Sequence, residues 1–279
     1  MIPLVVLQGA VVMPPLTAVV PEAPRRPVSA QGRDLEAEAR RVAVQLGQAP
    51  RRLTIRLGGV MTFLWASVAL IVLVSLVQDL LIFLAPEVGM TDRIYRLDLD
   101  TEASLPTWFS SGLMLVCALA LLAIAVQVKR DRLFQALPWF ILAGFFFVLS
   151  LDEIATIHEW LSAVLSARMD NTGLFYFAWT LPALVVCLAG LACFVPFILG
   201  FNGLDRTLLI GSAVVFLSGA VGMEMLGGAE AELNGVTGLR YRMLMTVEES
   251  LELAGLLIFL LFLLRQLRAS HNRTMICFE

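Results

Sequence analysis

Six runs of apolar residues, each long enough to cross a lipid bilayer, constrain this chain more than any other feature of its sequence. About 20 residues of helix span the ~30 Å hydrocarbon core of a membrane. Only helices or closed barrels satisfy their backbone polar groups in lipid, and continuous apolar runs, unlike alternating ones, select helices. We therefore predict an all-α integral membrane bundle of six transmembrane helices, at residues 59–84, 107–127, 137–162, 174–199, 207–228 and 243–264.

The composition supports this class of protein. Of the 279 residues, 59% are hydrophobic and 15% are charged, whereas soluble domains have about half and a quarter. The sixth run is the least regular, because it opens with Thr246 and three glutamates. The lipid bilayer is the expected surrounding, with a membrane-protein partner or a homo-oligomer as a further candidate. Because the chain has no basic stripe suited to nucleic acid, we expect no nucleic-acid partner.

The basic residues indicate the orientation of the bundle. Fifteen of the 20 lie in the terminal segments and in the loops at 128–136 and 200–206, and only five lie in the opposite loops. Since positive charge collects in cytoplasmic loops, both termini should be cytoplasmic. We divide the chain into a cytoplasmic N-terminal segment that is partly an amphipathic helix (1–52), the six-helix transmembrane domain (53–268) and a cytoplasmic tail (269–279).

Acidic residues concentrate at one side of this predicted bundle. Spans one, three and five leave the cytoplasm and carry their acids near their ends, while spans two and six start outside and carry theirs early. An acidic side chain at the centre of a spanning helix costs about 2.5–3.5 kcal/mol, so such residues usually face a cavity or a partner. Nine residues belong to this outward-facing set: Asp79, Glu102, Asp152, Glu153, Glu159, Glu224, Glu248, Glu249 and Glu252.

Helix geometry limits which of these acids can meet. If 137–162 is one helix, Asp152 and Glu159 share a face about 10 Å apart along the axis, while Glu153 and His158 flank that face on opposite sides. This predicts two levels on span three, with the aspartate deeper than the histidine. Glu248, Glu249 and Glu252 cover an arc of about 100° and can converge on one site. We expect the two groups to form facing walls of an outward-facing polar pocket.

Three interpretations of the pocket stay open. The first is a site for a divalent metal (Mn, Fe, Zn or Ca) or a cationic ligand, because carboxylates and an imidazole suit these ions, with His158 and Glu249 as ligands or as catalytic acid–base groups. The second is a cation- or proton-coupled transporter. The third is a structural or accessory subunit of a larger complex, in which the acids pair with Arg168, Arg240 and Arg242. The primary ligand candidates are Asp152, Glu153, His158, Glu159, Glu248, Glu249 and Glu252, and the secondary ones are Glu102, Glu224 and Asp79.

The segment DLDTEASLPTWFSS, residues 98–111, has the features of a helix start. Pro106 suits the first turn, Ser104 suits the cap, and Glu102 is favoured near the positive end of the helix dipole. His158 is one of two histidines, and its acidic neighbours should raise its pKa.

Three segments together resemble a known group of sequences: EASLPTWFSS at 102–111, LSLDEIATIHE at 149–159 and MTVEESLELAG at 245–255. The combination resembles a family of uncharacterised polytopic prokaryotic membrane proteins with PTW[FY]S, LDE…HE and EE.LE.G signatures. The resemblance covers most of the chain from about residue 59 but not the first 50 residues, and it implies only that the three acidic segments occur together. We expect the protein to be a multi-pass protein of the prokaryotic cytoplasmic (inner) membrane. Because the family has no established activity, the resemblance transfers no catalytic residue.

Overall fold

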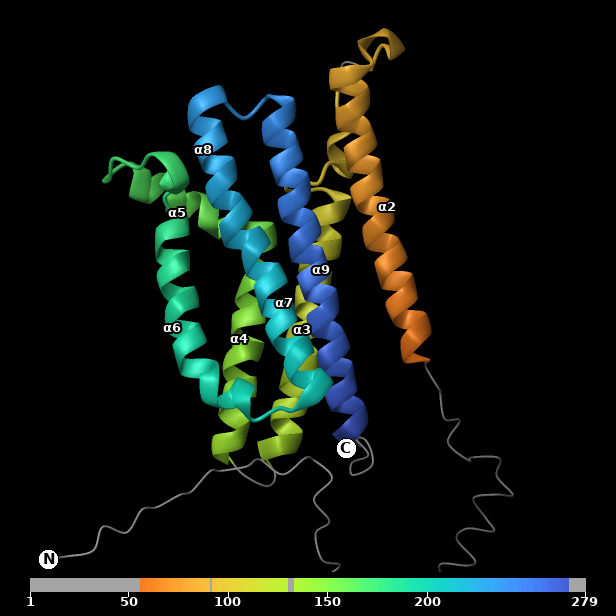
Figure 1. Ribbon diagram of the computed structural model, residues 1–279, viewed down its shortest axis with the longest axis vertical. Coiled ribbons are helices and arrows are strands. Elements are labelled where there is room, and N and C mark those ends of the chain that lie inside the picture. Colours follow the sequence, from red (N-terminus) through yellow and green to blue (C-terminus); the bar gives the residue numbers. More distant parts are fainter. Residues whose placement is uncertain (1–55, 91, 130–132, 271–279) are drawn as a thin grey trace, which may run out of the picture.

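Every element of the part of the chain that the structure describes is a helix. The computed structural model describes residues 56–90, 92–129 and 133–270. The long helices run side by side and alternate in direction along the chain (Figure 1). They are α2 (Leu57–Leu84), α3 (Leu105–Lys129), α4 (Leu133–Ala155), α5 (Ile157–Ser166), α6 (Thr180–Leu199), α7 (Gly203–Leu217), α8 (Glu224–Asn234) and α9 (Leu239–Ser270), with short 3₁₀ turns at Pro86–Val88 (η1), Tyr95–Leu97 (η2) and Gly173–Phe175 (η3) and a π-helical segment at Ser218–Met223 (η4).

Five helices are long and apolar enough to cross a membrane. They are α2, α3, α4, α6 and the continuous unit of α7, η4 and α8. This confirms the prediction of an all-helical, multi-pass membrane protein. The sixth predicted span lies within α9, which is the longest described helix at 32 residues. The described chain begins and ends at the same end of the bundle (Figure 1).

Helix α9 forms the centre of the bundle and contacts α2, α3, α7 and α8. Its lower half buries leucines at the i, i+3, i+4 spacing of one apolar face, among them Leu253, Leu256 and Leu260. The approach of α7 is close, because a Cβ on Gly255 would lie 2.6 Å from the backbone nitrogen of Phe216. The acidic half of α9 is therefore held in position by the packing of its apolar half.

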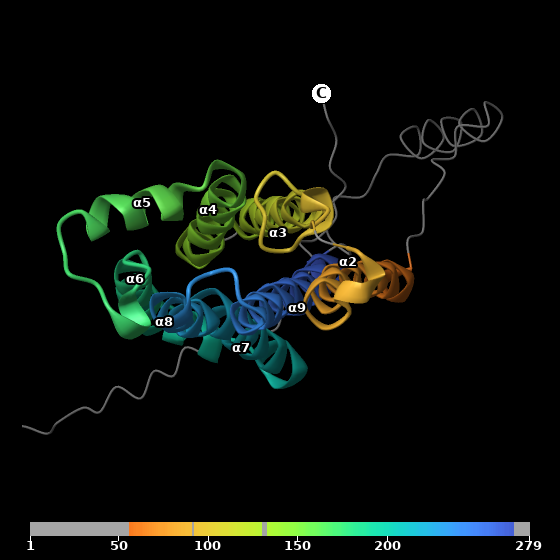
Figure 2. The ribbon, with the colours of Figure 1, turned by 90° about the horizontal axis from the view of Figure 1, so that it is seen from above.

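The predicted third span is wrong as a single helix. Helix α4 ends at Ala155, Thr156 has a left-handed φ of 54°, and α5 starts at Ile157. Seen from above, α5 runs outward from the end of α4 (Figure 2). The Asp152 carboxylate accepts the backbone N–H of His158 at 2.8 Å, so it satisfies a donor that the start of α5 leaves free. Hydropathy does not detect such a turn, because acidic and apolar residues alternate in the same way on both sides of it, and neither a glycine nor a proline marks it.

Other boundaries differ less from the predictions. The fourth span begins at Thr180 instead of 174, because η3 occupies residues 173–175. The fifth continues to Asn234 through the π-helical segment instead of stopping at 228. Ser104 caps α3 as predicted, since its Oγ accepts the Thr107 N–H at 3.2 Å. The predicted amphipathic segment at 1–52 and residues 271–279 of the predicted tail lie outside the described residues.

Candidate functional site: an acidic cavity at one end of the bundle

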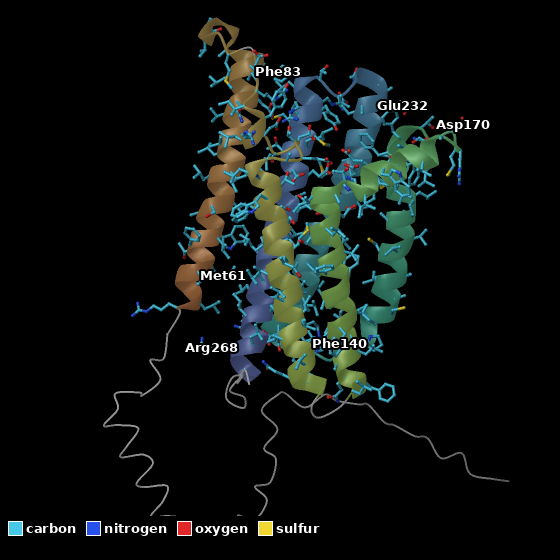
Figure 3. The ribbon with its side chains drawn as sticks, turned by 180° about the vertical axis from the view of Figure 1, so that it is seen from behind. Met61, Phe83, Phe140, Asp170, Glu232 and Arg268 are labelled. Carbon is cyan, nitrogen blue, oxygen red and sulfur yellow. The ribbon has the colours of Figure 1, made fainter. Side chains whose placement is uncertain are left out.

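A cavity of about 530 Å³ lies among the helices at the end of the bundle opposite to the chain ends. Oxygen-bearing side chains are dense in this half, which also carries Glu232 and Asp170, whereas Phe140 and Arg268 lie toward the other end (Figure 3). Among the described residues, no lysine or arginine lines the cavity. The lining has seven carboxylates and one imidazole, from Asp100, Glu102, Glu153, His158, Glu159, Glu224, Glu248 and Glu249.

Helix α9 contributes Glu248 and Glu249 to the cavity lining, together with Tyr241 and Met245. Glu248 is buried, and its Oε2 has no hydrogen-bond partner among the described residues. Glu252 does not line the cavity and lies against η4, where a Cβ on Gly219 would lie 3.0 Å from its Cγ. A π-helical turn often marks a functional site, and here Gly219 lets it approach the α9 backbone. Two of the three glutamates that the sequence placed on one arc therefore reach the cavity.

The opposite wall contains a carboxylate–imidazole pair. His158 Nδ1 lies 3.0 Å from Asp152 Oδ2, so the predicted separation of these residues into two levels is wrong. The bend at Thr156 brings them together, and Asp152 reaches the cavity only through the histidine, which does line it. Burial would lower the pKa of His158, but the hydrogen bond and charge of Asp152, with the charges of Glu224 and Glu159, raise it above its ordinary value. The predicted direction of this shift is confirmed.

Aromatic side chains form a third side. The Trp179 indole N–H donates to Glu224 Oε1 at 2.8 Å, and its ring centroid lies 5.1 Å from that of His158. Tyr176, Phe177 and Tyr241 also line the cavity. The cavity therefore combines carboxylates with π faces, both of which attract cations.

The loop before α3 contributes Glu102 to the cavity. Burial, together with the charge and hydrogen bond of Glu159, raises the pKa of Glu102 to about 6. The next residue, Ala103, has a φ of 29°, and it and Thr156 are the two non-glycine residues with positive φ in the described chain. Such strained residues persist only where the surrounding structure holds them, and they cluster at functional sites. Both flank this cavity.

A second acidic group borders the cavity, shares Asp100 with its lining and is paired with arginines of the chain itself. Asp79 accepts from Arg93 at 2.6 Å and from Arg242 at 3.3 Å. Arg242 also pairs with Asp98 and Asp100. We call these five residues the aspartate–arginine cluster. Asp79, a secondary candidate from the sequence, thus belongs to an ion-pair network and not to the cavity lining.

The described residues contain no group of three or more His, Cys, Asp or Glu side chains arranged to hold a metal ion. The predicted ligands Glu153, His158, Glu159, Glu248 and Glu249 line one cavity, but they project from α4, α5 and α9 around its circumference. Metal binding by these residues stays a prediction.

Comparison with known proteins identifies a family. Residues 63–267 match the family described as "Domain of unknown function (DUF8692)". The chain belongs to this family. The DUF8692 region includes the whole cavity lining and the aspartate–arginine cluster, and the resemblance to an uncharacterised family is confirmed at that level. No curated protein and no solved structure matches the chain.

Sequence reasoning missed several residues of this DUF8692 site. Asp98 and Asp100 stand in the segment DLDTE directly before Glu102, so the density of acids there was a usable signal. Ser162 follows His158 by one helical turn and also lines the cavity, but this becomes visible only once α5 is a separate helix. Nothing in the sequence pattern distinguishes Trp179 from the other tryptophans near the membrane surface.

Proposed function

We propose that this DUF8692 protein crosses the membrane six times, with α9 as the sixth crossing and both termini cytoplasmic, and binds a cationic small molecule in the outward-facing acidic cavity. One observation carries the proposal. Among the described residues, the lining of the cavity has seven carboxylates and no lysine or arginine. Asp100 pairs with Arg242 beside the cavity, but none of the six glutamates forms such a pair with a described residue, and Glu248 buries an oxygen with no hydrogen-bond partner among those residues. A bound cation would supply the missing charge and the missing contact.

The energetics favour a ligand over an empty cavity. Carboxylates brought together away from bulk water repel one another and lose hydration, and a buried charged group without a partner is costly. In the aspartate–arginine cluster the chain meets this cost with Arg93 and Arg242. None of the ion pairs between described residues gives an arginine or lysine to the cavity glutamates. The charge must therefore be balanced by protons or by a ligand.

The size and lining of the cavity favour an organic cation. Small-molecule sites have volumes of roughly 300–1,000 Å³, and this cavity, at about 530 Å³, falls within that range. No group of three or more described His, Cys, Asp or Glu side chains is arranged to hold a metal ion, and Trp179, Tyr176 and Tyr241 add π faces to the lining. An ammonium group placed between carboxylates and aromatic rings forms ion pairs with the carboxylates and cation–π contacts with the rings.

The test is ligand-dependent stabilisation of the purified protein in nonionic detergent. Thermal unfolding is followed with spermidine, tetraethylammonium or Mn²⁺ in the buffer. A ligand at 100 times its Kd stabilises a protein by about 2.7 kcal/mol, so we expect at least one organic cation to raise Tm by several degrees. Glu248→Gln should abolish the rise. Glu87→Gln, the same change at an exposed glutamate outside the cavity, should preserve it. If none of the probes shifts Tm, or if the probes raise the Tm of Glu248→Gln as much as that of the wild type, the proposal of cation binding in this cavity is wrong.

The Asp152–His158 pair favours a second function at the same site, acid–base chemistry on the bound molecule. A carboxylate on Nδ1 holds the imidazole in one tautomer and leaves Nε2 as the group that exchanges a proton. NMR titration of labelled histidine, with His158 assigned through a His271→Gln variant, checks this arrangement. We expect the pKa of His158 to be above the ordinary value in the wild type and lower in Asp152→Asn than in the wild type, because the hydrogen bond and charge of Asp152 contribute most to raising it. An unchanged pKa in Asp152→Asn would contradict the role of the pair.

A further inference from the structure

Helix α5 has two distinct faces. At about 100° per residue, His158, Glu159, Ser162, Ala163 and Ser166 occupy one side of the helix, and all five line the cavity. The other side carries only apolar residues, namely Ile157, Trp160, Leu161, Val164 and Leu165. Trp160 is 65% exposed on that side. A short helix of this kind at the end of a spanning helix is suited to lie in the membrane interface, with its apolar face toward the acyl chains.

The cavity is closed on its central side and open along α5. Of its lining residues, Glu248, Met245, Thr107 and Leu99 are buried. The exposed ones include Glu159, Ala163 and Ser166 of α5 and Tyr176, directly after η3. Figure 2 shows α5 at the outer edge of the bundle, on the side away from α9. The opening of the cavity therefore lies at the periphery, beside an amphipathic helix.

We call the exposed apolar residues of α5, η3 and the first turn of α6, which adjoin lining residues along the chain, the rim of this opening. Leu174 and Phe175 of η3 are 45% and 36% exposed, and Leu181 at the start of α6 is 38% exposed. Exposed apolar residues gathered around a polar site mark an interaction surface. This surface is continuous with the lipid-facing sides of α4 and α6, where Ile154 and Val185 are about 60% exposed. The rim thus joins the acidic cavity to the lipid-facing surface of the bundle.

We propose that the ligand of the cavity is a membrane-borne amphiphile with an ammonium headgroup. The headgroup sits among the carboxylates, and the hydrocarbon chain passes the rim formed by α5 and η3 into the bilayer. The negative charge of the lining favours a cationic headgroup. The continuity of the rim with the lipid-facing helices favours a ligand with a hydrocarbon chain. This inference rests on cation binding in the cavity and adds the class of molecule that binds.

The experiment separates headgroup from chain in dodecyl maltoside micelles. Hexadecylamine supplies both, ethylamine supplies the ammonium group alone, and hexadecanol supplies the chain alone. Tm is measured against the concentration of each. We expect hexadecylamine to raise Tm at a concentration at least ten-fold lower than ethylamine, and hexadecanol to leave Tm unchanged. Glu248→Gln should abolish the response to both amines.

A matched pair of variants separates specific entry from simple concentration of the amine in the micelle. Trp160→Asn removes the apolar rim on α5, and Trp108→Asn makes the same change at a 68% exposed tryptophan on α3 that does not line the cavity. We expect Trp160→Asn to move the hexadecylamine response about ten-fold higher in concentration without moving the ethylamine response, and Trp108→Asn to change neither.

The outcomes distinguish the two proposals. If ethylamine or spermidine raises Tm in a Glu248-dependent way but hexadecylamine needs the same concentration, the cavity binds a free cation and the amphiphile proposal is wrong. Equal effects of Trp160→Asn and Trp108→Asn would also overturn it. If no amine and no soluble cation shifts Tm, cation binding itself fails.

Discussion

The two acidic regions at this end of the bundle differ in where their positive charge comes from. In the aspartate–arginine cluster, Arg93 and Arg242 contact the three aspartates, so most of the negative charge is offset within the chain. In the cavity, none of the described lining residues is an arginine or lysine. Arg240, which the sequence offered as a partner for the acids, pairs with Glu230 instead. Arg242 thus pairs with acids of the cluster, as the third interpretation expected of it, while membership of a larger complex stays a prediction. The cavity glutamates have no such partner among the described residues, and we propose that a bound cation balances their charge.

The largest change in the free energy of unfolding should come from removing an arginine of the aspartate–arginine cluster. Arg242→Met leaves Asp79, Asp98 and Asp100 short of their shared cation, and Arg242 is buried. Breaking a buried ion pair by removing one partner costs about 3–5 kcal/mol. The control is Arg265→Met, because Arg265 and its partner Asp205 are 38% and 31% exposed and solvent-accessible pairs contribute about 0–1 kcal/mol. Unfolding in detergent, followed by tryptophan fluorescence, measures both. Equal losses in the two variants would show that the cluster is not structural.

A change at Gly219 should disturb the glutamates and leave the cluster intact. The Cβ of Gly219→Ala would lie 2.8 Å from the Glu248 carbonyl oxygen, so η4 and α9 must separate locally. Overpacking of this kind costs about 1–3 kcal/mol, and the spermidine response should weaken with it. Gly211→Ala, on α7 with nothing within 4 Å, is the control. If Gly219→Ala is destabilised but its Tm still responds to spermidine as the wild type does, spermidine binding in the cavity does not depend on the contact between η4 and α9.

Neutralising one acid should have opposite effects in the two regions. Without ligand, Glu248→Gln removes a charge that repels its neighbours, and we expect a gain of about 1 kcal/mol, within the range of costs for an unpaired buried group. Asp79→Asn should instead destabilise the protein, because it weakens the pairs with Arg93 and Arg242. The same unfolding assay, without added cations, measures both. If Glu248→Gln is destabilising as well, Glu248 has a structural partner and the comparison fails.

The smallest expected effect is a loss of stability as the pH rises, the opposite of what carboxylates with lowered pKa values produce. Burial raises the pKa of both Asp100 and Glu102 to about 6, so between about pH 4 and 6 the folded state binds more protons than the unfolded state. Stability should therefore fall as the pH rises through this window. The raised pKa of His158 adds a loss of the same sign at higher pH. Tm measured from pH 4.5 to 7.5 without cations tests this, and Glu102→Gln should reduce the slope. A Tm that rises with pH would contradict it.

The sequence predicted the cavity residues better than it predicted the third span, which the structure divides into α4 and α5. Glu153, His158, Glu159, Glu248 and Glu249 meet at one cavity as expected, because the cost of acids at membrane level restricts them to one polar space. The bend at Thr156 was missed, and with it the Asp152–His158 pair. A single left-handed residue changes the helix direction without changing the apolar pattern.

By itself, the sequence determined that this chain forms a helical membrane bundle with its acids toward one end. Runs of apolar residues and the cost of charge in lipid act locally, and both can be read from one helix at a time. The tertiary structure decided which acids are neutralised and which line the cavity. Arg242 stands ten residues before Glu252 on α9, yet its partners lie on α2 and in the loop before α3. The balance of charge in each region depends on contacts between distant segments, and these exist only in the folded chain.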